Sequence, residues 1–252
     1  NRLLTLFYRH NRVYPCCMKP QGDTTKRFLV LLGVYLLAVV GCGPPTVFTP
    51  GEGEVLFRDD FDVVLKEGWV LDGSSADVSL TERQGFVTLF PADAIRSGEQ
   101  AATTVLLREL DGDFVVVTRL EFQTITDLQS SGVVVQGEDG RTVLLGVSEI
   151  GQVGFRGVLM LADRGPGIER GRALVRSDLL TVYLRLAREG NRYTGSFSAD
   201  GVDFTAVGAL TDDLSATVNV GVGTLIAAAC SANCTERVPA EFDFFEVRLP
   251  VP

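Results

Sequence analysis

Residues 182–208, VYLRLAREGNRYTGSFSADGVDFTAVG, decide the fold class of this chain. Gly190-Asn191 separates two β-type runs, and Asp200-Gly201 turns the chain into a third run. Turn dipeptides of this kind, between short runs rich in β-branched and aromatic residues, are typical of antiparallel hairpins. The stretch therefore predicts an antiparallel sheet.

Side chains alternate between the two faces of a strand, so the same stretch predicts which residues face a core. The apolar residues Val182, Leu184 and Leu186 are expected to point inward. Tyr183 and Arg185 are then expected to point outward.

The pattern of short runs and turns continues along most of the chain. It predicts about a dozen strands within one all-β domain over residues 54–250, in which two antiparallel sheets bury their inner faces together. The other main runs are residues 55–57, 86–90, 103–107, 114–122, 132–136, 141–147, 218–225 and 242–249. No window of a dozen residues sustains helical periodicity outside residues 28–40.

Three segments carry a resemblance to a known family. Residues 56–61 (LFRDDF) with the following Gly68-Trp69, the hairpin pair of residues 182–208, and residues 241–247 (EFDFFEV) resemble the concanavalin A-like domain appended to family 43 β-xylosidases and its stand-alone relatives. The resemblance implies a jelly-roll sandwich whose last strand pairs with its first. It implies a fold and not an activity.

Charge and histidine content exclude several functions. The first 41 residues hold six of the 23 basic residues and one of the 32 acidic ones, so the rest of the chain has a formal charge of −14. Such a surface repels phosphate groups, and we expect no nucleic-acid partner. The single histidine, His10, precedes the domain, which removes Ser-His-Asp catalysis and His-ligated zinc from consideration.

The N-terminal part is expected to be a bacterial export signal. Met18 is followed by three basic residues and by an apolar run over residues 28–40, which is short for a membrane span of about 20 residues. The run ends in Val39-Val40-Gly41-Cys42, which resembles a lipobox, so we expect a lipid chain on Cys42 and attachment to the bilayer. Cleavage by an ordinary signal peptidase is the alternative.

These observations divide the chain into four parts. Residues 1–17 are interpreted as an upstream segment from a start assigned too early, residues 18–41 as the signal peptide, residues 42–53 as a Pro/Gly-rich tether, and residues 54–250 as the sandwich. Cys230 and Cys234 lie four residues apart. In an exported protein they are expected to form a disulfide.

The acids Glu241, Asp243 and Glu246 match the E-x-D-x-x-E spelling of family 16 glycoside hydrolases. Residues i and i+2 share a face of a strand, and a β-bulge can bring i+5 into line with them. A retaining hydrolase needs two such carboxyl groups about 5–5.5 Å apart. The alternative is that solvent-facing acids alternate with core phenylalanines Phe242, Phe244 and Phe245.

The sequence also contains candidate residues for a calcium site and for sugar stacking. Asp60 in the opening strand and Asp243 in the closing strand are candidate ligands for a structural calcium ion, because calcium prefers oxygen ligands. Tyr183, Tyr193 and Phe204 are candidate sugar-stacking residues, although most aromatic residues of a sandwich belong to its core.

Three functions remain open at this point. The leading hypothesis is a membrane-anchored module that binds a polysaccharide or another component of the cell envelope. The alternatives are a retaining hydrolase and an envelope lipoprotein that is purely structural or binds other proteins.

Overall fold

The computed structural model describes residues 53–92, 101–123, 129–150, 155–163, 169–227 and 238–251. These residues are nearly all β-structure, and the one helical segment among them is a short 3-10 turn, η1 (Ser75–Asp77). The strands are β1 (Val55–Asp59), β2 (Val70–Asp72), β3 (Val78–Ser79), β4 (Val87–Leu89), β5 (Ala101–Asp111), β6 (Phe114–Glu121), β7 (Gln129–Gln136), β8 (Thr142–Ile150), β9 (Phe155–Asp163), β10 (Glu169–Arg176), β11 (Thr181–Glu189), β12 (Arg192–Ser198), β13 (Thr205–Thr211), β14 (Thr217–Ala227) and β15 (Ala240–Arg248).

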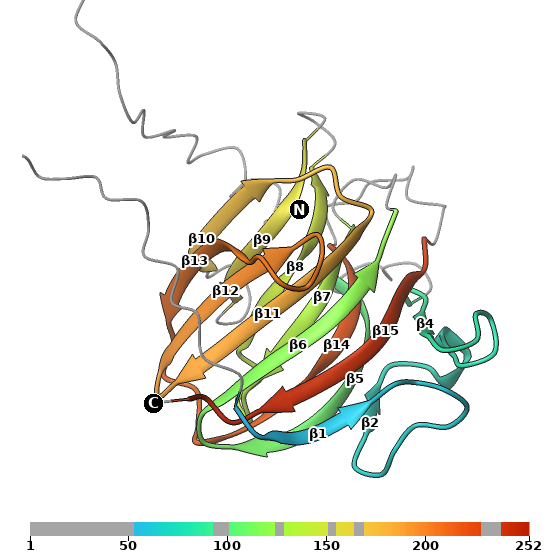
Figure 1. Ribbon diagram of the computed structural model, residues 1–252, viewed down its shortest axis with the longest axis horizontal. Coiled ribbons are helices and arrows are strands. Elements are labelled where there is room, and N and C mark those ends of the chain that lie inside the picture. Colours follow the sequence, from blue (N-terminus) through green and yellow to red (C-terminus); the bar gives the residue numbers. More distant parts are fainter. Residues whose placement is uncertain are drawn as a thin grey trace, which may run out of the picture.

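The strands form two antiparallel sheets that pack face to face (Figure 1). Sheet A has the order β13-β12-β11-β6-β15-β4-β3, and β1 also pairs with β15. Sheet B has the order β10-β9-β8-β7-β14-β5-β2. The predicted two-sheet sandwich is confirmed, and its first strand pairs with its last, as the resemblance implied.

The core lies between the sheets, and the predicted alternation holds along β11. Val182, Leu184 and Leu186 belong to the buried cluster, whereas Tyr183 points to the outer face of sheet A. The predicted turns are also present. Gly190 and Gly201 adopt positive φ angles of 58° and 79°, which glycine tolerates without a steric penalty.

The outer face of sheet B carries a second apolar cluster. Val105, Leu107, Val134, Leu144 and Leu159 are buried there, on the opposite side of their strands from core residues such as Leu106 and Leu145. The sequence signal for this cluster is the run of consecutive apolar residues in β5, β7 and β8, because a strand buried on both faces loses its alternation.

The sequence missed β9 and β10. None of the expected runs covers residues 155–176, but β9 occupies Phe155–Asp163 and β10 occupies Glu169–Arg176. The two strands pair in an antiparallel ladder with a register shift between Arg170 and Arg172. Charged residues in this ladder hide the alternation that would have identified it.

The N-terminal predictions fall outside the described residues. These are the signal peptide, the lipidation of Cys42 and the tether. Cys230 and Cys234 also lie outside the described residues, so their disulfide and the N-terminal features remain predictions. In the part of the chain that the structure describes, no helix is long and apolar enough to span a membrane.

Asp59 organises the loop that follows β1. Its side chain accepts hydrogen bonds from the backbone N–H of Phe61 (3.0 Å), the backbone N–H of Lys66 (2.9 Å) and Nε1 of Trp69 (2.8 Å). Phe61 has a φ of 53°, a left-handed conformation that is uncommon for a bulky side chain, and its ring is fully buried. The carboxylate therefore holds a strained turn in the position that inserts Phe61 into the core.

We predict that Asp59→Ala lowers the free energy of unfolding by at least about 3 kcal/mol, because three donors lose one buried acceptor. Urea denaturation measures the change. Asp62→Ala is the matched control, because Asp62 is exposed, and it should stay within about 0.5 kcal/mol of wild type. Equal stability of the two variants would contradict the role of Asp59.

Candidate functional site

A β-bulge in β15 determines which of its side chains face outward. In the pairing with β6, Phe242 lies opposite Leu120 and Phe244 lies opposite Arg119, so Asp243 is the extra residue. The bulge keeps Phe242 and Phe245 in the core although they are three residues apart. Glu241 and Glu246 consequently lie on the same outer face, which is the arrangement that a bulge makes possible for residues i and i+5.

The outer face of sheet A collects charged and aromatic side chains. We call this surface the polar face. It comprises Arg58, Arg83, Tyr183, Arg119, Glu121, Arg185, Phe204, Glu241, Asp243, Phe244, Glu246 and Arg248.

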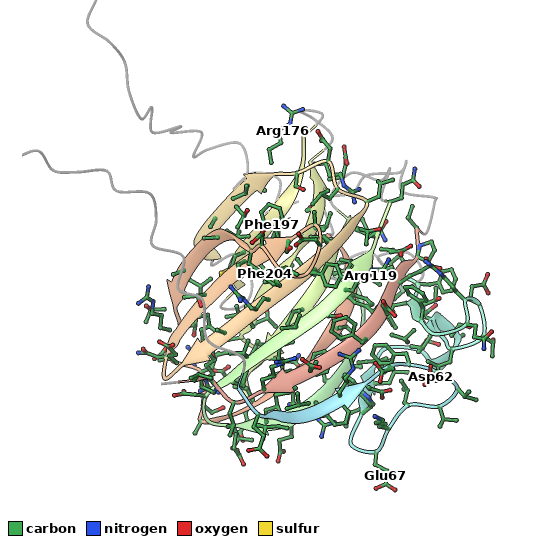
Figure 2. All side chains as sticks on the ribbon, viewed as in Figure 1. Asp62, Glu67, Arg119, Arg176, Phe197 and Phe204 are labelled. Atoms are coloured by element: carbon green, nitrogen blue, oxygen red, sulfur yellow. The ribbon has the colours of Figure 1, made fainter. Side chains whose placement is uncertain are left out.

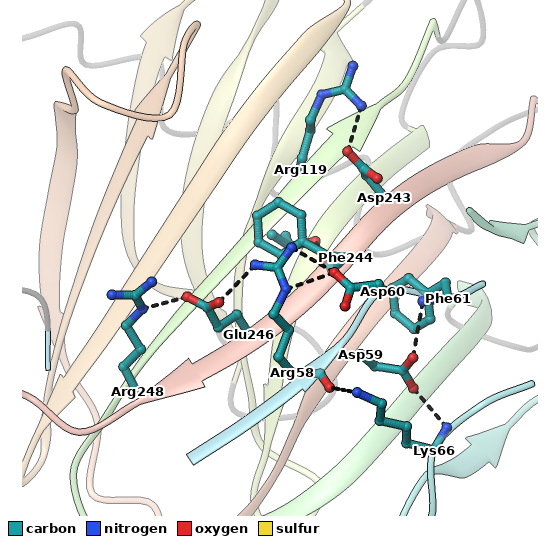
Figure 3. Close-up of polar contacts among 11 residues, drawn as sticks. Arg58, Asp59, Asp60, Phe61, Lys66, Arg119, Asp243, Phe244, Glu246 and Arg248 are labelled. Atoms are coloured by element: carbon teal, nitrogen blue, oxygen red, sulfur yellow. Dashed lines mark hydrogen bonds and ion pairs between the residues drawn. The ribbon is translucent and has the colours of Figure 1, made fainter. Parts of the chain in front are cut away.

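Glu246 lies at the centre of one ion-pair network (Figure 3). One of its oxygens accepts from Arg58 Nη1 at 2.8 Å and the other from Arg248 Nε at 2.5 Å. Arg58 also pairs with Asp60 at 2.7 Å, so this guanidinium connects two carboxylates. The Glu246 side chain is only 5% exposed, which makes it the most buried carboxylate among the ion pairs of the polar face.

A second network contains the other two acids of the E-x-D-x-x-E spelling. Arg119 pairs with Asp243 at 2.8 Å and with Glu121 at 2.5 Å. Arg83 then pairs with Glu121 at 2.6 Å and with Glu241 at 2.7 Å. Each of the three acids is therefore bound by arginine rather than directed at an open reaction centre.

The arginines also lower the pKa of two carboxyl groups on this face. Burial alone raises the pKa of Glu246, but the hydrogen bonds from Arg58 and Arg248 outweigh burial, and the pKa is lowered overall. The hydrogen bond from Arg83 lowers the pKa of Glu121. A general acid must hold a proton near neutral pH, so Glu246 is unsuited to protonate a leaving group.

Aromatic rings lie among the ion pairs. The rings of Tyr183 and Phe244 are 6.4 Å apart, and the Arg58 guanidinium lies 4.3 Å from the Phe244 ring centroid. Phe204 lies beside Arg185 at 4.1 Å, also on the outer face. Phe244 thus belongs to the polar face, and the prediction that it is a core residue is wrong because the bulge turns it outward.

Of the three aromatic residues proposed as sugar-stacking groups, Tyr193 is excluded. It is 0% exposed and belongs to the core cluster, because it points to the inner face of β12. Tyr183 and Phe204 are half-buried and lie on the polar face.

The structure does not bring Asp60 and Asp243 together as a calcium site. Asp60 pairs with Arg58, and Asp243 pairs with Arg119 (Figure 3). Among the described residues no group of three or more acidic, cysteine or histidine side chains could hold a metal ion. Calcium binding remains a prediction that this geometry does not support.

Sequence reasoning named Glu241, Asp243 and Glu246 but missed Glu121 and most of the arginines of the polar face. The signal for Arg119 is present in β6, where Arg119 and Glu121 alternate with the buried Thr118 and Leu120. Arg58 and Arg83 come from β1 and from the loop before β4, and only the fold places them next to β15.

The paired first and last strands, the two antiparallel sheets and the core between them define a concanavalin A-like β-sandwich. The family model of the β-xylosidase C-terminal concanavalin A-like domain matches residues 58–248. The chain belongs to this family. A comparison with curated protein sequences gives no match.

Solved structures support the same fold. A xylan β-1,4-xylosidase from Bacillus halodurans C-125 has a TM-score of 0.59 at 22% identity, and the match covers 76% of this chain and 38% of that one. The Bacteroides ovatus protein named Xyloglucan PUL GH43B has a TM-score of 0.60 at 20% identity, with coverages of 76% and 39%. A functionally unknown protein from Saccharomyces cerevisiae has a TM-score of 0.56 at 17% identity, with coverages of 73% and 98%.

The matches cover only part of the bacterial structures. The chain spans about two fifths of the length of the two bacterial family 43 structures, 38% and 39%. At these identities the likeness shows the fold alone.

We predict that Glu246 contributes to acid denaturation. Its folded-state pKa lies below the ordinary value of 4.5, so its stabilising effect is present above that pH and is lost as the pH falls through the folded pKa. Urea denaturation from pH 7 to pH 3 should show a shallower loss of stability in Glu246→Gln than in wild type.

Glu67→Gln is the control for the pH experiment, because it removes one carboxylate at an exposed position. It should follow the wild-type pH profile. A Glu246→Gln profile parallel to the wild-type one would show that the Arg58 and Arg248 contacts do not stabilise the charged carboxylate.

Proposed function

We propose that this protein is a carbohydrate-binding module and that its ligand lies along the polar face. The observation that carries the proposal is the combination of aromatic rings and fixed polar groups on one face of the sandwich. Tyr183 and Phe244 offer apolar ring surface, and the paired arginines and carboxylates around them offer donors and acceptors in fixed positions. Sugar rings present the complementary surface, with apolar C–H faces and hydroxyl edges.

The comparisons indicate which sugars to test first. Two of the similar structures are named for xylan and xyloglucan. Fold likeness does not transfer a substrate, so these polysaccharides enter as candidates for this chain and not as findings.

Binding is favoured over hydrolysis by the contacts of the three acids. Glu241, Asp243 and Glu246 each accept from an arginine, and the lowered pKa of Glu246 opposes proton donation. The same contacts provide what a binding surface needs, which is side chains held in place before the ligand arrives.

We also propose that the module is exported and attached to a bacterial membrane through Cys42. The lipobox-like ending of an apolar run supports this part of the proposal. The 12 residues from Cys42 to Gly53 would reach roughly 40 Å when extended, which is enough to hold the sandwich clear of the bilayer surface.

We predict that the purified protein binds xylan or xyloglucan and that Tyr183→Ala weakens this binding at least about tenfold, because a ring on the polar face is lost. Affinity electrophoresis or calorimetry measures the change. Val70→Ala is the control. Val70 is 63% exposed on β2 of sheet B, so its loss should leave affinity unchanged.

Two outcomes would contradict the binding proposal. Equal losses in Tyr183→Ala and Val70→Ala would remove the polar face as the site. Release of reducing sugars by the wild-type protein, abolished in both Glu241→Gln and Glu246→Gln, would establish the retaining hydrolase instead.

We predict that Cys42→Ser moves the protein from the membrane fraction to the soluble fraction, because the acyl chains that hold it at the bilayer are not added. Immunoblotting of the two fractions and mass spectrometry of Cys42 provide the measurement. Cys230→Ser should stay in the membrane fraction. Membrane retention of Cys42→Ser would disprove the anchor.

A further inference from the structure

Arg185 is a buried guanidinium on the polar face. It lies on β11 between Leu184 and Leu186, which point into the core, so its own side chain points to the outer side of sheet A. The residue is nevertheless only 8% exposed. Its partners across the sheet are Ser196 on β12 and Val117 on β6, neither of which is acidic.

Within the described residues, Arg185 has no carboxylate partner. The other arginines of the polar face pair with acids: Arg58, Arg83, Arg119 and Arg248. Nε of Arg185 donates to Ser196 Oγ at 3.2 Å, but Nη2 is buried without a hydrogen-bond acceptor.

Burial without a partner makes Arg185 costly to the fold. Burial lowers the pKa of Arg185, and no described acid offsets this effect. The group still carries its charge at neutral pH, as arginine does throughout proteins. A buried charge with an unused donor lowers stability, and a ligand that accepts from that donor would remove the cost.

An aromatic ring packs against Arg185, and the turn that carries this ring is held by hydrogen bonds. The Phe204 ring centroid lies 4.1 Å from the Arg185 guanidinium carbon. The turn before Phe204 is held by Asp200, which accepts from the backbone N–H groups of Val202 and Asp203, contacts that lower the pKa of Asp200 to about 2. Figure 2 shows Phe204 over sheet A, apart from Arg176 at the edge of the molecule.

The same turn connects Arg185 to the aromatic part of the polar face. A Cβ atom on Gly201 would lie 3.0 Å from the Tyr183 ring, so the turn rests directly on that ring. Tyr183 and Arg185 are two residues apart on β11 and therefore share the outer side of the strand. A ligand on Tyr183 is thus within reach of the Arg185 side chain.

We propose that Arg185 is an anion subsite of the polar face and binds an oxyanion carried by a sugar ring, either the carboxylate of a uronic acid or a sulfate ester. This inference rests on the proposed carbohydrate binding. The Phe204 ring rotates aside to admit the sugar and packs against it, while Nη2 donates a charge-assisted hydrogen bond to the oxyanion.

The charge distribution indicates a polysaccharide with isolated negative groups. The chain has a formal net charge of −9, which repels a dense polyanion at long range. The other arginines of the polar face are already neutralised by acids, so one uncompensated cation remains for one oxyanion. A mainly neutral backbone with occasional acidic residues meets both conditions.

Calorimetry with three matched xylo-oligosaccharides tests the inference. One oligosaccharide is neutral, one carries a single glucuronic acid branch and one carries a single sulfate ester. Wild-type protein is expected to bind at least one charged ligand about tenfold more tightly than the neutral one, the effect of one hydrogen bond to a charged group. Which charged ligand is preferred distinguishes a carboxylate from a sulfate.

Three variants assign the preference to Arg185. Arg185→Gln should bind all three ligands with the affinity that wild type has for the neutral one. Arg185→Lys, which keeps the charge, should retain part of the preference and so separates loss of charge from damage to the fold. Arg176→Gln removes one charge from an exposed position on β10 and should keep the full preference.

The outcomes separate this inference from the proposed function. No binding of any of the three ligands by wild type would overturn both. Equal binding of neutral and charged ligands would overturn the anion subsite alone. A preference that survives in Arg185→Gln, or that Arg185→Lys lacks entirely, would also overturn it.

Discussion

The bulge at Asp243 is the constraint on which the polar face depends. β15 pairs with β6 along one edge and with β1 and β4 along the other. Its acidic side chains therefore belong to both ion-pair networks of the polar face. Without an extra residue, strict alternation would place Phe242 and Phe245 on opposite faces. The bulge buries both rings and thereby leaves Glu241 and Glu246 together on the outer face, where Arg83 from the loop before β4 binds Glu241 and Arg58 from β1 binds Glu246.

The net charge of the polar face is close to zero, and ion pairs hold most of its charged side chains in place. Exposed ion pairs contribute little to stability, and the pairs of Arg83 and Arg119 belong to this partly exposed class. Their effect is to fix long side chains beside aromatic rings, as Arg83 is fixed 3.7 Å from the Phe86 ring. A surface already ordered in this way loses little conformational entropy on binding, which suits recognition of a polar ligand better than stabilisation of the fold.

The sequence was sufficient to predict the two-sheet sandwich, the pairing of the first and last strands and the direction of the side chains along β11, because period-two alternation and turn dipeptides are local signals. It placed Tyr193 and Phe244 wrongly for different reasons. Tyr193 shares the inner face of β12 with Phe197, and the alternation alone could have shown this. The position of Phe244 depends on where the bulge falls, and the arginine partners depend on which strands become neighbours, so both are tertiary properties that one strand does not encode.

The acids of β15 show why a motif in a strand does not define a reaction. Glu241, Asp243 and Glu246 have the spelling and, through the bulge, the shared face that a retaining hydrolase needs. The residues opposite them decide their chemistry. Arg58 and Arg248 bind the Glu246 carboxylate and lower its pKa, while Arg119 binds Asp243 and Arg83 binds Glu241. The same three acids without those arginines would include one, Glu246, whose pKa is raised by burial. Here they are converted into fixed hydrogen-bond acceptors, and the one arginine of the polar face that they leave unpaired lies two strands away on β11.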